Sequence, residues 1–222
     1  MAQTRKIEEA TFPRVPDENS LTGRNRRLLH EWRQLHLRTV KRRDVDCSVL
    51  ESNAFGLPVK YLVVYNIRSV CGIENPDASA EAGAASPPLF ASRFEMLLEI
   101  PEAYPCVDAP PRFRFLTEAT NGQAIPHPWH PNIRFFGEFA GRVCLNFPDT
   151  WTDLAWGVER VASYLRYDLY NAVQEPPYPE DLKVAQWTRK QGEPNGWIFF
   201  DQEISPVYTS NPTRNEYDDP AE

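Results

Sequence analysis

The stretch HPNIRFFGEFAGRVCLN occupies residues 130–146, and the interpretation of the whole chain depends on it. It holds a histidine, a proline and an asparagine, followed by a cysteine twelve positions after the asparagine. Cys144 lies between a valine and a leucine, and a single cysteine in such a setting is usually a small buried apolar residue. The alternative is that Cys144 is a nucleophile, served by the amide side chain of Asn132.

Composition and charge limit the classes of protein that the chain can represent. Of its 222 residues, 41% are hydrophobic and 25% are charged, which is typical of a globular domain with tails. No apolar run approaches the ~18–20 residues of a membrane helix, and residues 1–20 lack the apolar core of a signal peptide. We therefore expect a cytoplasmic protein that does not cross a membrane. The net charge of −7 argues against a nucleic-acid partner.

The four cysteines are scattered along the chain, with no C-x-x-C pair: Cys47, Cys71, Cys106 and Cys144. This spacing favours free thiols over a disulfide framework. His127 and His130 form an H-x-x-H pattern, but a proline follows each histidine and a fourth ligand is missing. We therefore expect neither a metal nor another cofactor in this chain.

Hydrophobic spacing predicts an α+β fold before the opening stretch. Apolar residues at helical intervals, such as Leu28, Trp32 and Leu35, predict a helix over residues 21–41. Alternating or β-branched runs predict four strands, over residues 46–52, 59–67, 93–100 and 112–117. Residues 74–88 are rich in alanine, serine and proline and read as an exposed loop. This order favours a four-stranded antiparallel meander with a helix packed on one side.

The stretch is followed by further helices. Helical spacing returns at Leu154, Val158 and Val161 and predicts a helix over 153–173, with a shorter helix at 180–190. We expect a flexible arm at 1–18, one domain at 19–192 and a tail at 193–222. The aromatic segment 197–200 of that tail either docks on a partner or packs back on the domain.

Five short motifs follow one another along this framework. They are Tyr104-Pro105 with Pro110-Pro111, the pair Phe113 and Phe115, His130-Pro131-Asn132-Ile133, the segment GRVCL at 141–145, and Trp151. Together with the order of elements, they resemble the ubiquitin-conjugating enzyme family over roughly residues 21–190. Each motif is weak alone, but the set in this order is fairly specific.

The resemblance implies a function and a set of site residues. Cys144 would accept a ubiquitin-like protein as a thioester from an activating enzyme and pass it to an amine on a target, with or without a ligase. Asn132 would stabilise the oxyanion or hold the active-site loop, and His130 would belong to the same catalytic group. The family's supporting positions correspond to Tyr104, Leu145 and Trp151, and its activating-enzyme contact to Arg24 and Arg27. No cofactor would be needed, because the activating enzyme consumes the ATP.

The chain also departs from the family pattern. Eleven residues separate Asn132 from Cys144, more than the family's usual number, and the extra residues fall in an aromatic-rich excursion at Arg134–Ala140. Thr152-Asp153 replaces the family's Ser-Pro, and only Glu180 and Asp181 are candidates for an acidic residue near the thiol. These departures indicate a divergent branch, similar to the conjugating-type enzymes of bacterial ubiquitin-like operons.

Several alternatives stay open at the level of sequence. Asn132 follows a proline, so it either only shapes a turn or has a direct catalytic role. Phe135-Phe136 either packs within its loop or contacts the donor protein. The basic cluster between Arg24 and Arg43 is either a solvated face or a docking face. The whole domain is either an active conjugating enzyme, or a weak or inactive binding module or adaptor of the same fold.

Overall fold

The computed structural model describes residues 14–15, 17–76, 85–106, 108–119, 121–145, 153–173, 175 and 178–198. The strands are β1 Val45–Ser52, β2 Pro58–Tyr65, β3 Ser69–Ile73, β4 Pro88–Ala91, β5 Phe94–Glu99 and β6 Arg112–Phe115. The helices are α1 Gly23–Thr39, α2 Leu154–Leu165 and α3 Leu182–Trp187, with the short turns η1 Glu18–Ser20 and η2 Thr188–Gly192. Within the described part of the chain, no helix combines the length and the apolar character that a membrane span needs.

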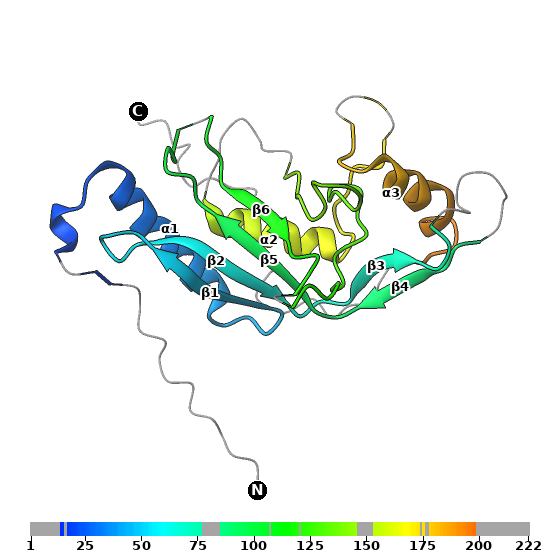
Figure 1. Ribbon diagram of the computed structural model, residues 1–222, viewed down its shortest axis with the longest axis horizontal. Helices are drawn as coiled ribbons and strands as arrows, with labels where there is room; N and C mark the ends of the chain where they lie inside the picture. The colour runs from blue at the N-terminus through cyan, green and yellow to red at the C-terminus, as the bar shows by residue number, and fades with distance from the viewer. Residues whose placement is uncertain are drawn as a thin grey trace, which may run out of the picture.

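The main sheet has the strand order β1-β2-β5-β6, every pair antiparallel, and α1 and α2 cover one of its faces (Figure 1). This confirms the predicted α+β class, with an N-terminal helix, a four-stranded meander and C-terminal helices. The alternation of the strands explains the core, because every second side chain points toward the helices. Tyr61, Val63 and Tyr65 of β2 are buried opposite Leu98, Met96 and Phe94 of β5.

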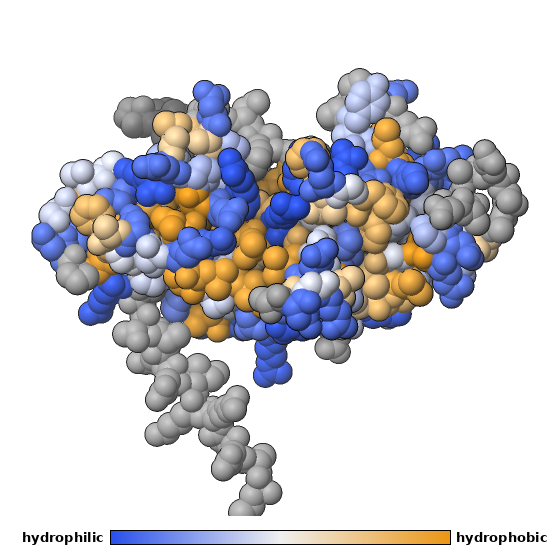
Figure 2. Space-filling view, in the orientation of Figure 1, coloured by the Kyte–Doolittle hydropathy of each residue, from blue (hydrophilic) through white to orange (hydrophobic). Residues whose placement is uncertain are grey.

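The other face of the sheet is turned toward the viewer in Figure 1. Leu62 and Leu97 pair across β2 and β5 on this face and are half-buried. Figure 2 shows apolar side chains gathered over the middle of this view, with polar side chains around them. The strand face that carries no helix is therefore not uniformly polar.

A second, two-stranded sheet, formed by β3 and β4, was not predicted. The two strands flank the region read as a loop, and each is too short to give a clear alternating pattern. The hairpin lies at the same end of the molecule as α3 (Figure 1). A second hydrophobic cluster joins them, made of Val70, Ile73, Trp129, Tyr167, Val184, Trp187 and Ile198. This cluster supports Trp129, which directly precedes the H-P-N-I segment.

Described residues on both sides of the predicted domain limits of 19–192 contact the folded core. Val15 packs on the main core, and Glu18 forms a bidentate ion pair with Arg33 at 2.6 Å, so these two residues before position 19 contact the domain. Trp197 stacks on Trp187 with ring centroids 6.4 Å apart, and Ile198 is buried. The start of the expected tail therefore packs back on α3, while Phe199 and Phe200 lie outside the described residues.

Helix α2 is shorter than the predicted helix over 153–173. It ends at Leu165, because Tyr167 adopts a positive φ of 58°, which leaves the right-handed helical region. The segment after it turns back toward the H-P-N-I residues instead of continuing the helix. Helix α3 begins at Leu182, later than predicted, and Asp181 caps it with hydrogen bonds from the Lys183 and Val184 amides.

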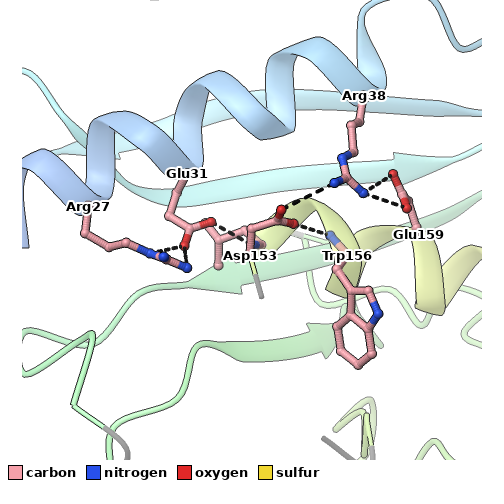
Figure 3. Close-up of polar contacts among 7 residues, drawn as sticks. Arg27, Glu31, Arg38, Asp153, Trp156 and Glu159 are labelled. Carbon is pink, nitrogen blue, oxygen red and sulfur yellow. Dashed lines mark hydrogen bonds and ion pairs between the residues drawn. The ribbon is translucent and has the colours of Figure 1, made fainter. Parts of the chain in front are cut away.

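A buried carboxylate joins three separate parts of the fold, and Figure 3 shows its contacts with Arg27 on α1 and with the start of α2. The side chain of Glu31 on α1 is fully buried. Its Oε1 accepts hydrogen bonds from Arg27 Nε at 2.6 Å and from the Tyr104 hydroxyl, and its Oε2 accepts one from the Leu154 amide at 2.6 Å. Glu31 thereby fixes α1 to the connector between β5 and β6 and to the first residue of α2.

Candidate active site

The segment that carries Cys144 lies along the free edge of β6. The Phe115 amide donates to the Gly141 carbonyl at 2.9 Å, and the Val143 amide donates to the Phe113 carbonyl at 3.1 Å. Leu145 is buried in the main core next to it. The thiol-bearing residue is therefore held between a sheet edge and a core anchor, and Cys144 itself is only half-buried.

The H-P-N-I segment pairs with the other side of the Cys144 segment. The Cys144 amide donates to the Asn132 carbonyl at 2.8 Å. The Arg134 amide donates to the Arg142 carbonyl at 2.9 Å, and the Gly141 amide donates to the Arg134 carbonyl at 2.8 Å. The Arg134–Ala140 excursion is thus closed at its base like a hairpin. It loops out and leaves Asn132 directly across from Cys144.

The aromatic residues of the excursion have different surroundings. Phe135 stacks on His127 at 4.3 Å between ring centroids and packs edge-on against Trp129 at 4.6 Å. Phe136 and Phe139 are 37% and 51% exposed. Phe135 therefore packs within its loop, whereas Phe136 and Phe139 present apolar surface to solvent.

Gly141 is required where the excursion returns to the sheet. Its φ is +86°, and a Cβ added there would lie 2.1 Å from the Phe115 carbonyl oxygen. We expect Gly141→Ala to lower the free energy of unfolding by ~1–3 kcal/mol more than Gly137→Ala. Gly137 is the matched control, since its φ is +80° but a Cβ there meets no atom within 4 Å. Denaturant unfolding of both variants measures the difference, and equal losses would contradict the role of the close contact.

His130 lies beside the cysteine segment in a fully buried setting. The side chain is fully buried, and its ring stacks on Tyr164 with centroids 4.9 Å apart. The Asn132 amide donates to Nδ1 at 3.1 Å, so Nε2 carries the proton and donates to the Leu169 carbonyl at 3.1 Å. Burial lowers the pKa of His130 to about 3. These contacts give His130 a structural role, and its predicted catalytic role stays a prediction.

Asn132 connects the cysteine segment to the loop after α2. Only 2% of its surface is exposed, and its Oδ1 accepts a hydrogen bond from the Asn171 amide at 2.8 Å. His130 and Asn132 therefore hold the Leu169–Asn171 segment from two points. These contacts give Asn132 a structural function, and its oxyanion role remains a prediction.

Tyr164 is a site residue that sequence reasoning missed. Its hydroxyl donates to the Cys144 carbonyl at 3.2 Å and accepts from Arg160 Nε at 3.2 Å. Burial raises the pKa of Tyr164, so the phenol stays protonated and able to donate. In the sequence Tyr164 looks like one more apolar position of a helix, and no motif marks it. The fold alone brings it to the cysteine segment.

Replacing Tyr164 with phenylalanine tests this positioning role. The ring stack on His130 is kept, but the Cys144 carbonyl and Arg160 lose their partner. If Cys144 accepts an acyl group, as the resemblance implies, we expect kcat for that transfer to fall roughly fivefold, the equivalent of about 1 kcal/mol, with KM for the acyl donor unchanged. Tyr170→Phe is the control, because that hydroxyl bonds Glu193 at 2.9 Å instead. Equal kcat losses in the two variants would count against a specific role of Tyr164.

The two acidic candidates have different environments. Asp181 is buried, and besides capping α3 its carboxylate accepts the Phe135 amide at 3.0 Å. Glu180 pairs with Arg142 at 2.6 Å and with Arg134 at 3.5 Å. Since Arg142 is two residues before the cysteine, Glu180 is the acid beside the Cys144 segment, and Asp181 supports the backbone.

Tyr104 and the two predicted arginines lie in other surroundings. Tyr104 is buried in the Glu31 cluster, where its hydroxyl also accepts from Arg27 Nε at 3.2 Å. Arg24 donates to the Pro101 carbonyl at 3.3 Å. Both guanidinium groups therefore face the connector between β5 and β6. Trp151, the third expected support residue, lies outside the described residues.

The remaining predictions concern cysteines and metal ligands. All four cysteines fall within the described residues, and none of them forms a disulfide. The His127 side chain does not belong to a group of possible metal ligands among the described residues. Its Nε2 lies 3.2 Å from the Phe135 carbonyl oxygen. Across the described ranges, no three His, Cys, Asp or Glu side chains are grouped as a metal site would require.

An N-terminal helix, a four-stranded antiparallel sheet, C-terminal helices and an H-P-N segment paired with a cysteine define a ubiquitin-conjugating fold. No family model matches the chain. Over 113 residues it is 32% identical to ubiquitin-conjugating enzyme E2 K from Homo sapiens, Bos taurus and Mus musculus, a match that covers 50% of this chain and 48% of each relative. The chain thus spans about half the length of these curated relatives.

The structure of human ubiquitin-conjugating enzyme E2 G1 aligns with a TM-score of 0.37 and 21% identity, covering 63% of this chain and 94% of that one. The curated matches, the order of elements and the H-P-N-I and GRVCL segments support a divergent ubiquitin-conjugating enzyme family for this chain.

Proposed function

We propose that the protein is a conjugating enzyme that carries a ubiquitin-like protein as a thioester on Cys144 and passes it to an amine. The observation that carries this proposal is the hydrogen bond between the Cys144 amide and the Asn132 carbonyl, at 2.8 Å. This hydrogen bond places Asn132 across from the half-buried Cys144, although the Arg134–Ala140 excursion lies between them in the sequence. The similarity to ubiquitin-conjugating enzymes suggests a transferase and agrees with this reaction.

In the first step the Cys144 thiolate attacks the carbonyl carbon of the donor thioester. A new carbon–sulfur bond forms, and the thiolate of the activating enzyme leaves. Exchange between two thioesters needs no cofactor in this chain, because the acyl group arrives already activated. The rigid backbone around Cys144 contributes mainly by positioning the thiol for attack.

In the second step an amine of the target attacks the same carbonyl carbon. A lysine amine has a pKa near ~10.4, so it must lose a proton before or during the attack. Negative charge then develops on the thioester oxygen, and the Cys144 thiolate leaves. The Asn132 carboxamide is held through its Oδ1 by the Asn171 amide, and its NH2 group is the neutral donor that we propose for that oxygen. Loss of one such donor costs roughly 10²–10³ in rate in other enzymes.

The outer side of α1 is the proposed contact surface for the activating enzyme. Arg24 and Arg27 are turned toward the connector, whereas Arg26, His30 and Leu37 are exposed on the helix, Leu37 at 53%. We propose that these exposed residues belong to the contact surface, and the predicted contact of Arg24 and Arg27 stays a prediction. A ligase and a target protein complete the set of proposed partners.

Thioester formation tests the function directly. The chain is incubated with its cognate activating enzyme, the ubiquitin-like protein and ATP, and then analysed with and without a thiol reductant. We expect an adduct that the reductant removes. If binding to the ubiquitin-like protein is measurable but no reducible adduct forms, the chain is a binding module or adaptor of the same fold.

The biological setting is also a proposal. We place the protein in the cytoplasm and, because of its long excursion, among the conjugating-type enzymes of bacterial ubiquitin-like operons. A neighbouring gene for a ubiquitin-like protein that ends in glycine would support this. A genomic neighbourhood without any activating-enzyme or modifier gene would argue against it.

A further inference from the structure

We propose that the acidic segment of the chain that begins at Asp201 docks on an exposed basic side of α3 and η2. This side carries Lys183 of α3 together with Arg189 and Lys190 of η2, and we call it the basic face. The occupant belongs to the same chain and lies outside the described residues. The inference concerns a contact within the molecule and does not depend on the proposed function.

The basic face is turned to the solvent. All three cations are exposed, whereas Trp187, which lies between them in the sequence, is buried in the second hydrophobic cluster. With a rise of about 1.5 Å per residue, Lys183 and Lys190 lie about 10 Å apart along the helix axis. Leu182, which is 53% exposed, adds an apolar side chain to the same face. The face therefore offers positive charge around one apolar contact.

No acidic side chain balances the basic face among the residues that the structure describes, because none of its three cations forms an ion pair there. The neighbouring acids have other partners. Glu193 accepts a hydrogen bond from the Tyr170 hydroxyl at 2.9 Å, and Glu180 pairs with Arg142 at 2.6 Å. The Asp181 carboxylate accepts backbone amides. In a chain whose net charge is −7, this local positive charge favours an anionic occupant.

The last described residues anchor the chain next to the basic face. The Trp197 amide donates to the Gly192 carbonyl at 2.9 Å, at the end of η2, and the Trp197 ring stacks on Trp187. Ile198 is buried in the same hydrophobic cluster. The segment that follows Ile198 is therefore tethered beside η2, close to two of the three cations.

The tethered segment has the charge and the reach that the basic face requires. Residues 199–222 contain six acidic residues and one arginine, and Asp201 and Glu203 are the first two acids. Five residues separate Glu203 from the Ile198 anchor and span at most about 18 Å, more than the length of the face. Ile204 follows and supplies an apolar partner for the face. A short tether also gives a local concentration in the millimolar range, which favours this segment over a free acidic peptide.

Zero-length cross-linking of the full chain tests the contact. A carbodiimide joins a carboxylate to a lysine amine only where the two groups touch, and peptide mapping by mass spectrometry identifies the pair. We expect links from Asp201 or Glu203 to Lys183 or Lys190 at least about fivefold more often than to Lys41. Lys41 is the control, because it is an exposed lysine after the end of α1. A mixture of chains with natural and heavy nitrogen separates links within one chain from links between two.

Two double variants give a second, independent measurement. Asp201→Asn with Glu203→Gln, and Asp218→Asn with Glu216→Gln, each remove two negative charges from the segment. The backbone amide signals of the basic face are followed by NMR in the isotope-labelled full-length chain. We expect the first double variant to move these signals and the second to leave them close to those of the wild type.

Cross-links from Asp201 and Glu203 that reach Lys41 as often as the basic face would overturn the inference. The same holds if the two double variants move the signals of the basic face alike, or if neither moves them. Links found only between different chains would assign the face to a second copy and would also overturn docking within the chain. Neither measurement uses an activating enzyme or a modifier, so failure of the proposed function would leave this inference standing.

Discussion

Replacing Cys144 with serine abolishes the reductant-sensitive adduct if the chain works as proposed. A hydroxyl is a far weaker nucleophile than a thiolate, and any acyl group that it accepts forms an oxyester, which thiols do not reverse. We expect either no adduct or one that persists in reductant. A charging reaction, analysed by gel with and without reductant, gives the answer.

The other cysteines supply the controls for this experiment. Cys106 is exposed and Cys71 is half-buried, so both are accessible enough to report non-specific acylation. Cys106→Ser and Cys71→Ser should charge like the wild type. A reducible adduct that survives in Cys144→Ser but is lost in one of these variants would move the site away from the H-P-N-I segment.

The largest loss of stability is expected for Glu31→Ala. This change removes a fully buried carboxylate and leaves Arg27, the Tyr104 hydroxyl and the Leu154 amide without the group that they bind. Breaking a buried ion pair in this way costs about 3–5 kcal/mol. Because Glu31 joins α1, the β5–β6 connector and the start of α2, all three should lose their mutual packing.

Denaturant unfolding measures this loss, followed by a probe of helix content. Glu31→Gln should cost less, since the amide keeps one oxygen acceptor and the shape of the side chain. Glu102→Ala is a surface control in the same connector, where the side chain is exposed, and it should change stability by less than ~0.5 kcal/mol. Comparable losses for Glu31→Ala and Glu102→Ala would show that the buried cluster does not fix these elements.

Hydrophobic periodicity was sufficient to predict α1, β2, β5 and β6, because each buries one face on a single core. Strand β1 was predicted from a weaker alternation, and only Val45 of it is fully buried. It failed for residues 166–173, where Leu169 continues the helical spacing of α2. There the positive φ of Tyr167 ends the helix, and the backbone of Leu169 and Asn171 serves as hydrogen-bonding partner for His130 and Asn132. Tertiary contacts outweighed the local pattern.

The second hydrophobic cluster could not be predicted for a different reason. Its members come from β3, from the segment before His130, from the loop after α2, from α3 and from the start of the tail, and none of these pieces has a long periodic pattern. Only the folded chain shows that Trp129 and Trp187 meet, with ring centroids 6.1 Å apart.

The candidate site was predictable in part. The motifs indicated that Asn132 and Cys144 belong together, although eleven residues separate them. They could not show that backbone hydrogen bonds close the excursion, that His130 is fully buried, or that the Tyr164 hydroxyl reaches the Cys144 carbonyl. They also could not show which face of α1 carries Arg24 and Arg27, since a shift of one or two residues along the helix moves a side chain to a different face.

The central claim is that Cys144 Sγ carries the acyl group of a ubiquitin-like protein. The most direct test isolates the wild-type adduct formed with the cognate activating enzyme, digests it under non-reducing acidic conditions and maps the linkage by mass spectrometry. We predict that the C-terminal residue of the modifier is attached to the peptide that contains Cys144, and that thiol treatment releases it. A modifier attached to any other residue, or a linkage that resists thiols, would contradict the account.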